Sequence, residues 1–425
     1  MIELIAIISL VTLIIIGMPI GFVLIIVGSG GLLFINGLDV FMSNITSISF
    51  RSVNSFTFTT IPLFILMAHF LSKSGIADDL FDSMLKWIGH LPGGAGVASV
   101  IASAGFGALS GSSVAATSTM AQIAIPQMVK SNYSSKFAAG LIASCTGTLA
   151  VLIPPSIPLI LYGIQTETSV GKLLIAGVIP GIVLAMIIIG YIIIVSFRNK
   201  NTVEASTWRD RFSSLKKVVP AVLLIIFVIT LLYLGVATST EVAAFGAFGA
   251  LAMGLILRKL NVKTIYDSLI TTARQTSMIF LIVIGANIFA NFIATTRVGV
   301  RIVDAIVASG LSAYTILFFI IVMYLILGLF LDMIASLLIT LPIVFPLIVE
   351  LGFEPIWFGV VLVLLLEIGL VTPPVGLNLF ITSEYARIPV QKVFAGSIPF
   401  IFILLLMIVI LIIFPDIVMY MPSRM

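Results

Sequence analysis

The sequence has few charged residues, few histidines and a single cysteine. Of its 425 residues only 9% are charged, whereas a soluble domain carries about 25%, so a soluble enzyme and a disordered chain are both excluded. Cys145 has no second cysteine with which to form a disulfide. His69 and His90 are too few for a histidine metal centre, and no cysteine or carboxylate lies at ligand spacing from them. The net charge of +4 gives no reason to expect a nucleic-acid partner.

Long apolar stretches dominate the rest of the sequence. Apolar residues make up 60% of the chain, and they do not alternate with polar residues as in the strands of a membrane β-barrel. About 20 apolar residues span a bilayer as a helix. The composition therefore predicts an all-α polytopic membrane protein with about ten transmembrane helices. The predicted spans are 2–17, 19–37, 55–73, 137–163, 172–197, 218–236, 239–257, 273–294, 354–384 and 395–421.

Two further apolar stretches, 93–130 and 311–350, do not look like single spans. The first has the small polar cluster Ser110-Gly111-Ser112-Ser113 in its middle, and the second has Gly328 and Asp332 there. Both are predicted to be re-entrant hairpins, in which two half-helices meet at a tip inside the membrane. Non-helical backbone is allowed at that depth only where protein or a water-filled cavity satisfies it.

The chain repeats itself at a spacing of about 220 residues. Pro126 is matched by Pro346, and the pair Pro154-Pro155 is matched by Pro373-Pro374. Five predicted spans lie between the two hairpins, and because five is odd, the hairpins enter from opposite faces. Inverted repeats with interrupted helices are typical of secondary transporters, with the site where the interruptions meet.

This repeat predicts a division of the chain into two halves and a linker. Each half contains scaffold helices, one hairpin and one helix broken at its proline pair. The polar linker is predicted to be cytoplasmic, because this orientation places most of the 21 Lys and Arg residues inside and both termini outside. The predicted parts are the first repeat 1–197 with hairpin 93–130 and broken helix 137–163, the linker 198–217, and the second repeat 218–425 with hairpin 311–350 and broken helix 354–384.

The hairpin tips and the broken helices contain the residues that could bind ions or an anion. Hydroxyls, freed carbonyls and the partial charges of helix ends could hold Na⁺ or an anionic group. The alternative is a close helix contact between small residues, which is common in membranes. The candidates are Ser110, Ser112, Gly147, Pro154 and Ser156 in the first half, and Gly328, Asp332, Thr372, Pro373 and Gly376 in the second.

Three ionisable residues within predicted spans or hairpins have two interpretations each. An ionisable group at membrane depth is costly and usually functional, so Asp332 is predicted to contact substrate or a coupling ion; alternatively it caps the second half-helix. Glu367 lies one turn before the second break and is either a proton or cation site or a hydrogen-bonded packing residue. His69 is interpreted as a buried hydrogen-bonded group rather than a proton relay.

Several of these motifs, in this order, resemble a known family. They are FGALSGSSVAAT, IAIPQM and LIPPSIPLILYG in the first half, and GLFLDMIASLLITLPIVFPL and VTPPVGLNLF in the second. Together they are similar to the large membrane subunit of tripartite ATP-independent periplasmic (TRAP) transporters, over essentially the whole chain. The resemblance implies an elevator fold in the inner membrane of a bacterium and Na⁺-coupled uptake of a small organic acid, without an organic cofactor. It also implies a periplasmic substrate-binding protein and a small four-helix membrane subunit as partners, within a membrane whose lipids surround the spans.

The resemblance also assigns roles to individual residues. It implies one Na⁺ site at each hairpin tip and a substrate anion between them. Because a carboxylate repels a second carboxylate but accepts hydroxyls, Asp332 favours a sialic-acid-like sugar acid over a C4-dicarboxylate. The implied residues are Ser110, Ser112, Gly147 and Pro154 for the first Na⁺, Gly328, Thr372, Pro373 and Gly376 for the second, and Ser112, Ser156 and Asp332 for the substrate.

Other function classes fit the sequence less well. A stand-alone divalent-anion/Na⁺ symporter shares the inverted hairpins but needs no binding protein. An intramembrane serine protease needs a nucleophilic serine with a histidine base in reach, and the segment around Ser110 does not match that pattern. A passive channel is disfavoured because the breaks are paired and no pore-filter sequence is repeated. The sequence therefore predicts a transporter and not an enzyme.

Overall fold

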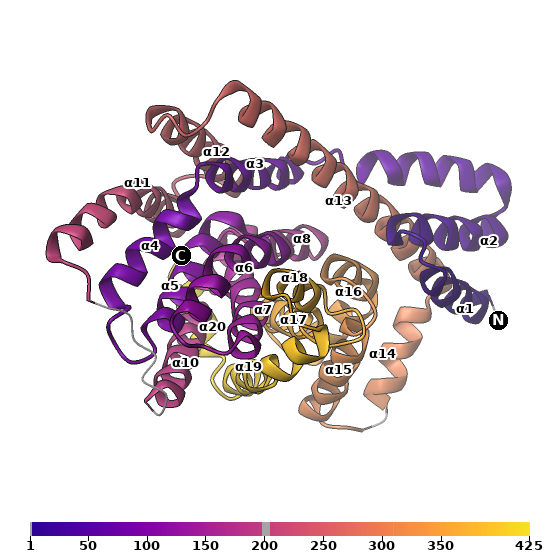
Figure 1. The fold of residues 1–425 in the computed structure, drawn as a ribbon. Coiled ribbons are helices and arrows are strands. Elements are labelled where there is room, and N and C mark those ends of the chain that lie inside the picture. Colours follow the sequence, from indigo (N-terminus) through magenta and orange to yellow (C-terminus); the bar gives the residue numbers. More distant parts are fainter. Residues whose placement is uncertain (1, 198–204, 309) are drawn as a thin grey trace.

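The protein is described here by a computed structural model, which covers residues 2–197, 205–308 and 310–425. In these residues all regular secondary structure is helical (Figure 1). The first seven residues of the predicted linker, 198–204, lie outside the described part. The helices of the first half are α1 (Ile2–Ile15), α2 (Ile20–Arg51), η1 (Phe56–Thr59), α3 (Thr60–Lys73), α4 (Ile76–Ile88), α5 (Gly94–Ser110), α6 (Ser113–Lys130), α7 (Ser135–Leu152), α8 (Ile157–Gln165), α9 (Val170–Ala176) and α10 (Val178–Ser196). Those of the second half are α11 (Trp208–Tyr233), α12 (Ser239–Ile256), α13 (Val262–Thr296), α14 (Val298–Ala308), α15 (Ala313–Gly328), α16 (Met333–Glu350), α17 (Pro355–Leu370), α18 (Leu377–Ala386), α19 (Val390–Ile413), α20 (Asp416–Met419) and η2 (Pro422–Arg424).

Helices α1–α3 and α11–α14 form an outer layer. The long helix α13 packs along both α2 and α3, and α12 packs along α3. In Figure 1 this layer runs along one side of the molecule, with α1 and the N-terminus at its far end. Glycines allow the close packing of α2 on α13. A Cβ atom on Gly28 would lie 2.9 Å from the Phe289 backbone, and one on Gly31 would lie 2.4 Å from the Phe292 ring.

The inner body consists of α5–α8 and α15–α18. Helix α7 lies at its centre and packs against α5, α6, α17 and α18. The run from Trp357 to Leu370 in α17 is buried, as is the run from Ala138 to Leu152 in α7, so these two broken helices form the core. Helices α10 and α19 cover the inner body on the side away from the outer layer (Figure 1).

Nine helices of the described residues are long and apolar enough to cross a membrane. Four shorter apolar helices accompany them: α1, α5, α15 and α17. Apolar side chains also point outward, for example Leu4 in α1 with 62% of its surface exposed and Phe248 in α12 with 71%. Such exposure suits contact with lipid. The predicted all-α, multi-pass membrane fold is therefore confirmed.

Helices end and begin where the two hairpins and the two breaks were predicted. Helices α5 and α6 form the first predicted hairpin, and α15 and α16 form the second. The predicted broken helices are interrupted between Leu152 and Ile157 and between Leu370 and Leu377. Two helices begin earlier than predicted: α11 begins at Trp208, inside the predicted linker 198–217, instead of at residue 218, and α13 begins at Val262 instead of residue 273. The predicted end of the second span at residue 37 coincides with a kink in α2, where the backbone of Gly37 is not helical (φ 73°, ψ 174°).

Candidate functional site

The tip of the first hairpin is joined to the first broken helix by main-chain atoms. Gly111, between α5 and α6, adopts a left-handed conformation (φ 59°), and a Cβ there would lie 2.7 Å from Pro155 O. The Gly111 carbonyl accepts a hydrogen bond of 3.1 Å from the amide of Ile157, the first residue of α8. Ser112 is the N-cap of α6 and accepts from the amide of Ala115 at 3.5 Å. The tip is thus fixed in place beside the break.

The tip of the second hairpin repeats this arrangement. The Leu329 carbonyl accepts a hydrogen bond of 3.2 Å from the amide of Val375, inside the second break. Asp332 is the N-cap of α16, and its Oδ1 accepts from the amide of Ala335 at 2.9 Å. The two tips correspond in position, because Ser112 and Asp332 lie 220 residues apart in the sequence. The internal repeat therefore extends to individual hydrogen bonds.

Each hairpin also crosses its broken helix at a pair of small residues. A Cβ on Gly107 of α5 would lie 2.6 Å from the Cα of Ala150 in α7. A Cβ on Gly369 of α17 would lie 2.5 Å from the Cα of Gly328 in α15. Only small residues let two helix backbones approach this closely. The predicted site residue Gly328 therefore has a packing role in this structure.

A buried polar cluster connects the two halves at the centre of the inner body. The Ser113 hydroxyl, in the first turn of α6, donates a hydrogen bond of 3.0 Å to Glu367 Oε2 on α17. Asn378 Nδ2, in the first turn of α18, donates to Ser113 Oγ at 3.0 Å. A Cβ on Gly147 of α7 would lie 2.2 Å from Ser113 Oγ and 3.0 Å from Glu367 Oε2. Gly147 thus leaves the space in which the three side chains meet.

The predicted residues of the first site fall into two places. Ser110 and Ser112 lie at the tip, and Pro154 belongs to the break beside it. Ser156 is fully buried, and its hydroxyl accepts from the amide of Leu159 at 3.4 Å as the N-cap of α8. Gly147 belongs instead to the central cluster.

The predicted residues of the second site lie around one break. The Thr372 hydroxyl donates to the carbonyl of Ile368 at 2.6 Å. Pro373 follows it, and Gly376 begins α18 in a left-handed conformation (φ 39°). A Cβ on Gly376 would lie 3.1 Å from Thr372 O, so the turn is tightly closed. Each proline pair contains a cis peptide bond.

A cavity of about 200 Å³ lies between the first tip and the outer layer. Ser110 and Ser112 line it from the inner body, and His69 of α3 and Gln275 of α13 line it from the outer layer. His69 Nε2 and Gln275 Oε1 lie 3.1 Å apart and form a hydrogen bond, which agrees with the interpretation of His69 as a hydrogen-bonded group. Neither Ser156 nor Asp332 is among the residues that line this cavity.

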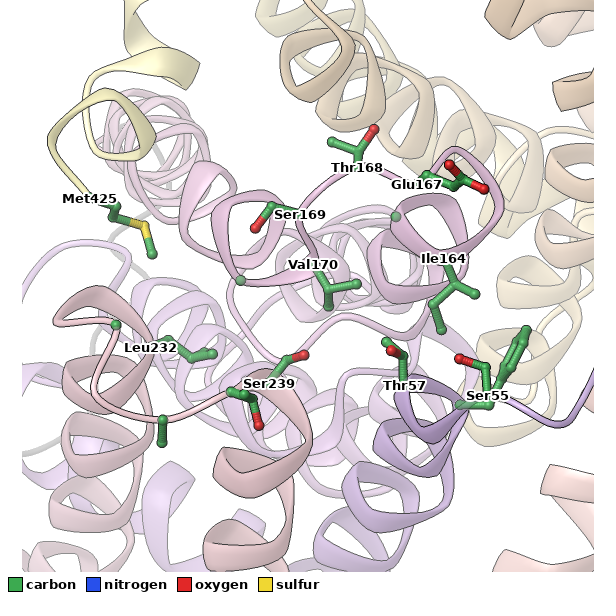
Figure 2. Close-up of a pocket in the computed structure, with 16 residues that line it drawn as sticks. Ser55, Thr57, Ile164, Glu167, Thr168, Ser169, Val170, Leu232, Ser239 and Met425 are labelled. Atoms are coloured by element: carbon green, nitrogen blue, oxygen red, sulfur yellow. The ribbon is translucent and has the colours of Figure 1, made fainter.

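A larger cavity of about 670 Å³ opens at the loops that end several helices. Figure 2 shows Ser55 and Thr57 before α3, Glu167–Val170 between α8 and α9, and Ser239 at the start of α12 around it. Its polar lining consists mainly of hydroxyl groups, with the carboxylate of Glu167 at the rim. No motif in the sequence indicated this cavity, because it is formed by three loops and the C-terminal Met425, which are distant along the chain.

Sequence reasoning placed Ser113 in the first tip and Asn378 beside the second break, and it left the role of Glu367 open; it did not predict that the three side chains meet. The signal for Glu367 was its position within a long apolar run, LVLLLEIGL. Ser113 and Asn378 each begin a half-helix, and their contact depends on how the two halves fold together. It could not be read from spacing, since 265 residues separate them.

Comparisons with known proteins agree with this architecture. The family model of the tripartite ATP-independent periplasmic transporter, DctM component, matches residues 7–417. The C4-dicarboxylate TRAP transporter large permease protein DctM of Pseudomonas aeruginosa is 35% identical over 88% of each chain. The sialic acid TRAP transporter large permease protein SiaM of Vibrio cholerae is 30% identical over 96% of this chain and 95% of its own.

One further relative and one solved structure are also similar to this chain. The 2,3-diketo-L-gulonate TRAP transporter large permease protein YiaN of Escherichia coli is 31% identical over 95% of each chain. The crystal structure of the Alcanivorax borkumensis YdaH transporter superposes with a TM-score of 0.64 over 90% of each chain at 14% identity, which shows a shared fold. This multi-pass inner-membrane protein therefore belongs to the family of TRAP transporter large permease subunits.

Proposed function

We propose that this protein carries out Na⁺-coupled uptake of a small organic acid by an elevator mechanism. In this proposal the inner body carries substrate and ions across the membrane, and the outer layer stays fixed. A periplasmic binding protein delivers the substrate, and a small four-helix membrane subunit supports the outer layer. The N- and C-termini lie on the periplasmic side.

The observation that carries the proposal is the pair of equivalent tips. Each tip places a half-helix N-terminus, capped by Ser112 or Asp332, beside a broken helix whose carbonyls are partly free. Positive helix ends attract an anion, and free carbonyls and hydroxyls attract Na⁺. One such site in each half suits a transporter that binds an anionic substrate together with Na⁺.

Cavities between the outer layer and the inner body support the elevator part of the proposal. Besides the cavity of about 200 Å³ at the first tip, one of about 260 Å³ lies between α8, α13 and α16, where Asn287 and Pro342 line it. Another of about 720 Å³ separates α13 and α14 from α16, where Arg297 and Glu350 line it. These cavities lie along the boundary between the two parts, and a boundary with open space suits sliding.

The substrate class rests on the relatives and on Asp332. Three of the relatives are named for C4-dicarboxylate, sialic acid and 2,3-diketo-L-gulonate. All three are small organic acids, and two are polyhydroxylated. Ser112, Ser156 and Asp332 are the proposed substrate residues. The Asp332 carboxylate suits a hydroxyl-rich acid, since it accepts hydroxyls and repels a second carboxylate.

The proposal is tested by uptake into proteoliposomes that contain this chain and its small partner subunit. The binding protein and radiolabelled sialic acid or succinate are added outside, with or without an inward Na⁺ gradient. Uptake that requires both the gradient and the binding protein supports the proposal. Uptake that requires Na⁺ but no binding protein identifies a stand-alone symporter, and uptake indifferent to Na⁺ contradicts the ion coupling.

A further inference from the structure

The Glu367 carboxylate lies at the centre of the inner body without a positively charged neighbour. Glu367 and Asn378 have no exposed surface, and Ser113 has 5%. The ion pairs found in the described residues join Lys86 to Asp82, Lys259 to Asp79 and Arg301 to Glu3, and none includes Glu367. Burying an ionised carboxylate is costly unless a cation or several donors compensate for it.

The available donors leave two oxygens of this cluster without a partner. The single hydroxyl proton of Ser113 is used by Glu367 Oε2, and Asn378 Nδ2 donates to the same hydroxyl oxygen. Glu367 Oε1 and Asn378 Oδ1 are buried and accept no hydrogen bond. Buried polar atoms nearly always have a partner. These two oxygens are therefore available as acceptors for a hydrogen bond or as ligands for a cation.

We propose that Glu367 Oε1 and Asn378 Oδ1 are ligands of a third cation site, distinct from the two tip sites and specific for a monovalent ion such as Na⁺. The ligand atoms are all oxygens, which hard cations prefer. One carboxylate balances one positive charge, whereas sites for Ca²⁺ use several acidic groups. Ser113 is a positioning residue, because it contacts both ligand side chains through their other atoms.

The site gives the proposed Na⁺ coupling a physical cause, and in this respect it rests on the proposed function. Carrying an uncompensated charge through the membrane is unfavourable. The inner body contains Glu367 and would also carry an anionic substrate. A cation at Glu367 compensates the charge of this carboxylate before the body moves. The ligand side chains are held by the first half, because Ser113 belongs to it and hydrogen-bonds both of them.

Equilibrium binding of ²²Na⁺ to the purified protein, without substrate, tests the site directly. We expect Glu367→Gln, which keeps the shape but removes the charge, to bind one Na⁺ fewer per chain than the wild type. Asn378→Ala removes the second ligand and should weaken the same binding event about tenfold or more. Ser113→Ala should weaken it less, because the ligands themselves remain. Thermal unfolding of each variant shows that it is folded.

The matched control is Thr272→Val in α13, which removes another buried hydroxyl without a hydrogen-bond partner, but in the outer layer. It should bind as many Na⁺ ions as the wild type. If folded Glu367→Gln and Asn378→Ala both keep wild-type stoichiometry and affinity, the third site is wrong and Glu367 is held by a proton. Uptake by the wild type that does not depend on Na⁺ would contradict the proposed function but not the third site. The site is tested separately, by the loss of one bound Na⁺ in Glu367→Gln.

Discussion

The Ser113 hydroxyl donates a hydrogen bond to Glu367 Oε2 across 254 residues of sequence. This bond joins the first turn of α6, next to the tip of the first hairpin, to α17, which belongs to the broken helix of the second half. Because both atoms are buried, the bond is not weakened by competing water. The two halves of the inner body are therefore joined by a buried polar contact at this point, as they also are where the Tyr162 hydroxyl donates to the Pro355 carbonyl at 2.7 Å.

The space that Gly147 leaves beside Ser113 is predicted to be essential for stability and transport. Gly147→Ala places a Cβ 2.2 Å from Ser113 Oγ and 2.8 Å from Asn378 Nδ2, so the cluster must open. We expect a loss of stability of about 1–3 kcal/mol, measured by thermal unfolding, together with reduced Na⁺-driven uptake. Gly190→Ala in α10 is the control, because nothing lies within 4 Å of its Cβ. Equal stability of the two variants would show that the cluster adapts.

The two roles of Asp332 can be separated by two substitutions. Asparagine caps a helix about as well as aspartate, whereas alanine loses about 0.5–2 kcal/mol. We expect Asp332→Asn to unfold near the wild-type temperature but to transport a hydroxyl-rich acid more slowly, with a raised KM. Asp332→Ala should lose stability as well. Wild-type kinetics of Asp332→Asn would mean that the side chain only caps α16.

The helix crossings predict a matched effect in the two halves. Gly107→Ala and Gly369→Ala each force a Cβ to within 2.6 Å of a facing backbone. Both variants should separate a hairpin from its broken helix and lower the free energy of unfolding by about 1–3 kcal/mol. The loss is measured as a lower unfolding temperature. Gly30→Ala in α2 has open space around its Cβ and should be neutral. An effect in one half alone would show that the two crossings are not equivalent.

The proposed orientation predicts which loops can be labelled from outside. Replacing the buried Cys145 by alanine gives a background without cysteine. Glu167→Cys, in the loop between α8 and α9, should react with a membrane-impermeant maleimide added to spheroplasts. Ser213→Cys, near the start of α11, should react only after permeabilisation. The reverse pattern would place both termini in the cytoplasm.

Much of the fold could be predicted from the sequence because its signals are local. Ser110–Ser113 and the proline pairs are short polar or helix-breaking segments in apolar surroundings, and the structure places a tip or a break at each. Pro126 and Pro346 also repeat, but both lie inside helices, in α6 and α16. A single proline near the end of a long helix bends it without ending it.

The central cluster could not be predicted, because its members are joined only by the tertiary fold. Gly147 looked like part of the first tip, since it shares a helix with the break at Pro154. It lies about two turns earlier on α7, however, and faces Glu367 and Asn378 of the other half. Its true neighbours depend on how α7 is rotated about its axis, and a helix that is buried on all sides has no amphipathic pattern from which to read that rotation.

The bonds from Ile157 to Gly111 and from Val375 to Leu329 use main-chain atoms alone. Apart from Gly111, where a Cβ would meet Pro155 O, their geometry does not depend on which side chains the tips display. Residues such as Ser112 and Asp332 can therefore be exchanged during evolution while each tip remains attached to its break. A single framework can in this way be adapted to acids of different size and hydroxylation by changing a few side chains, without a new fold having to arise for each nutrient.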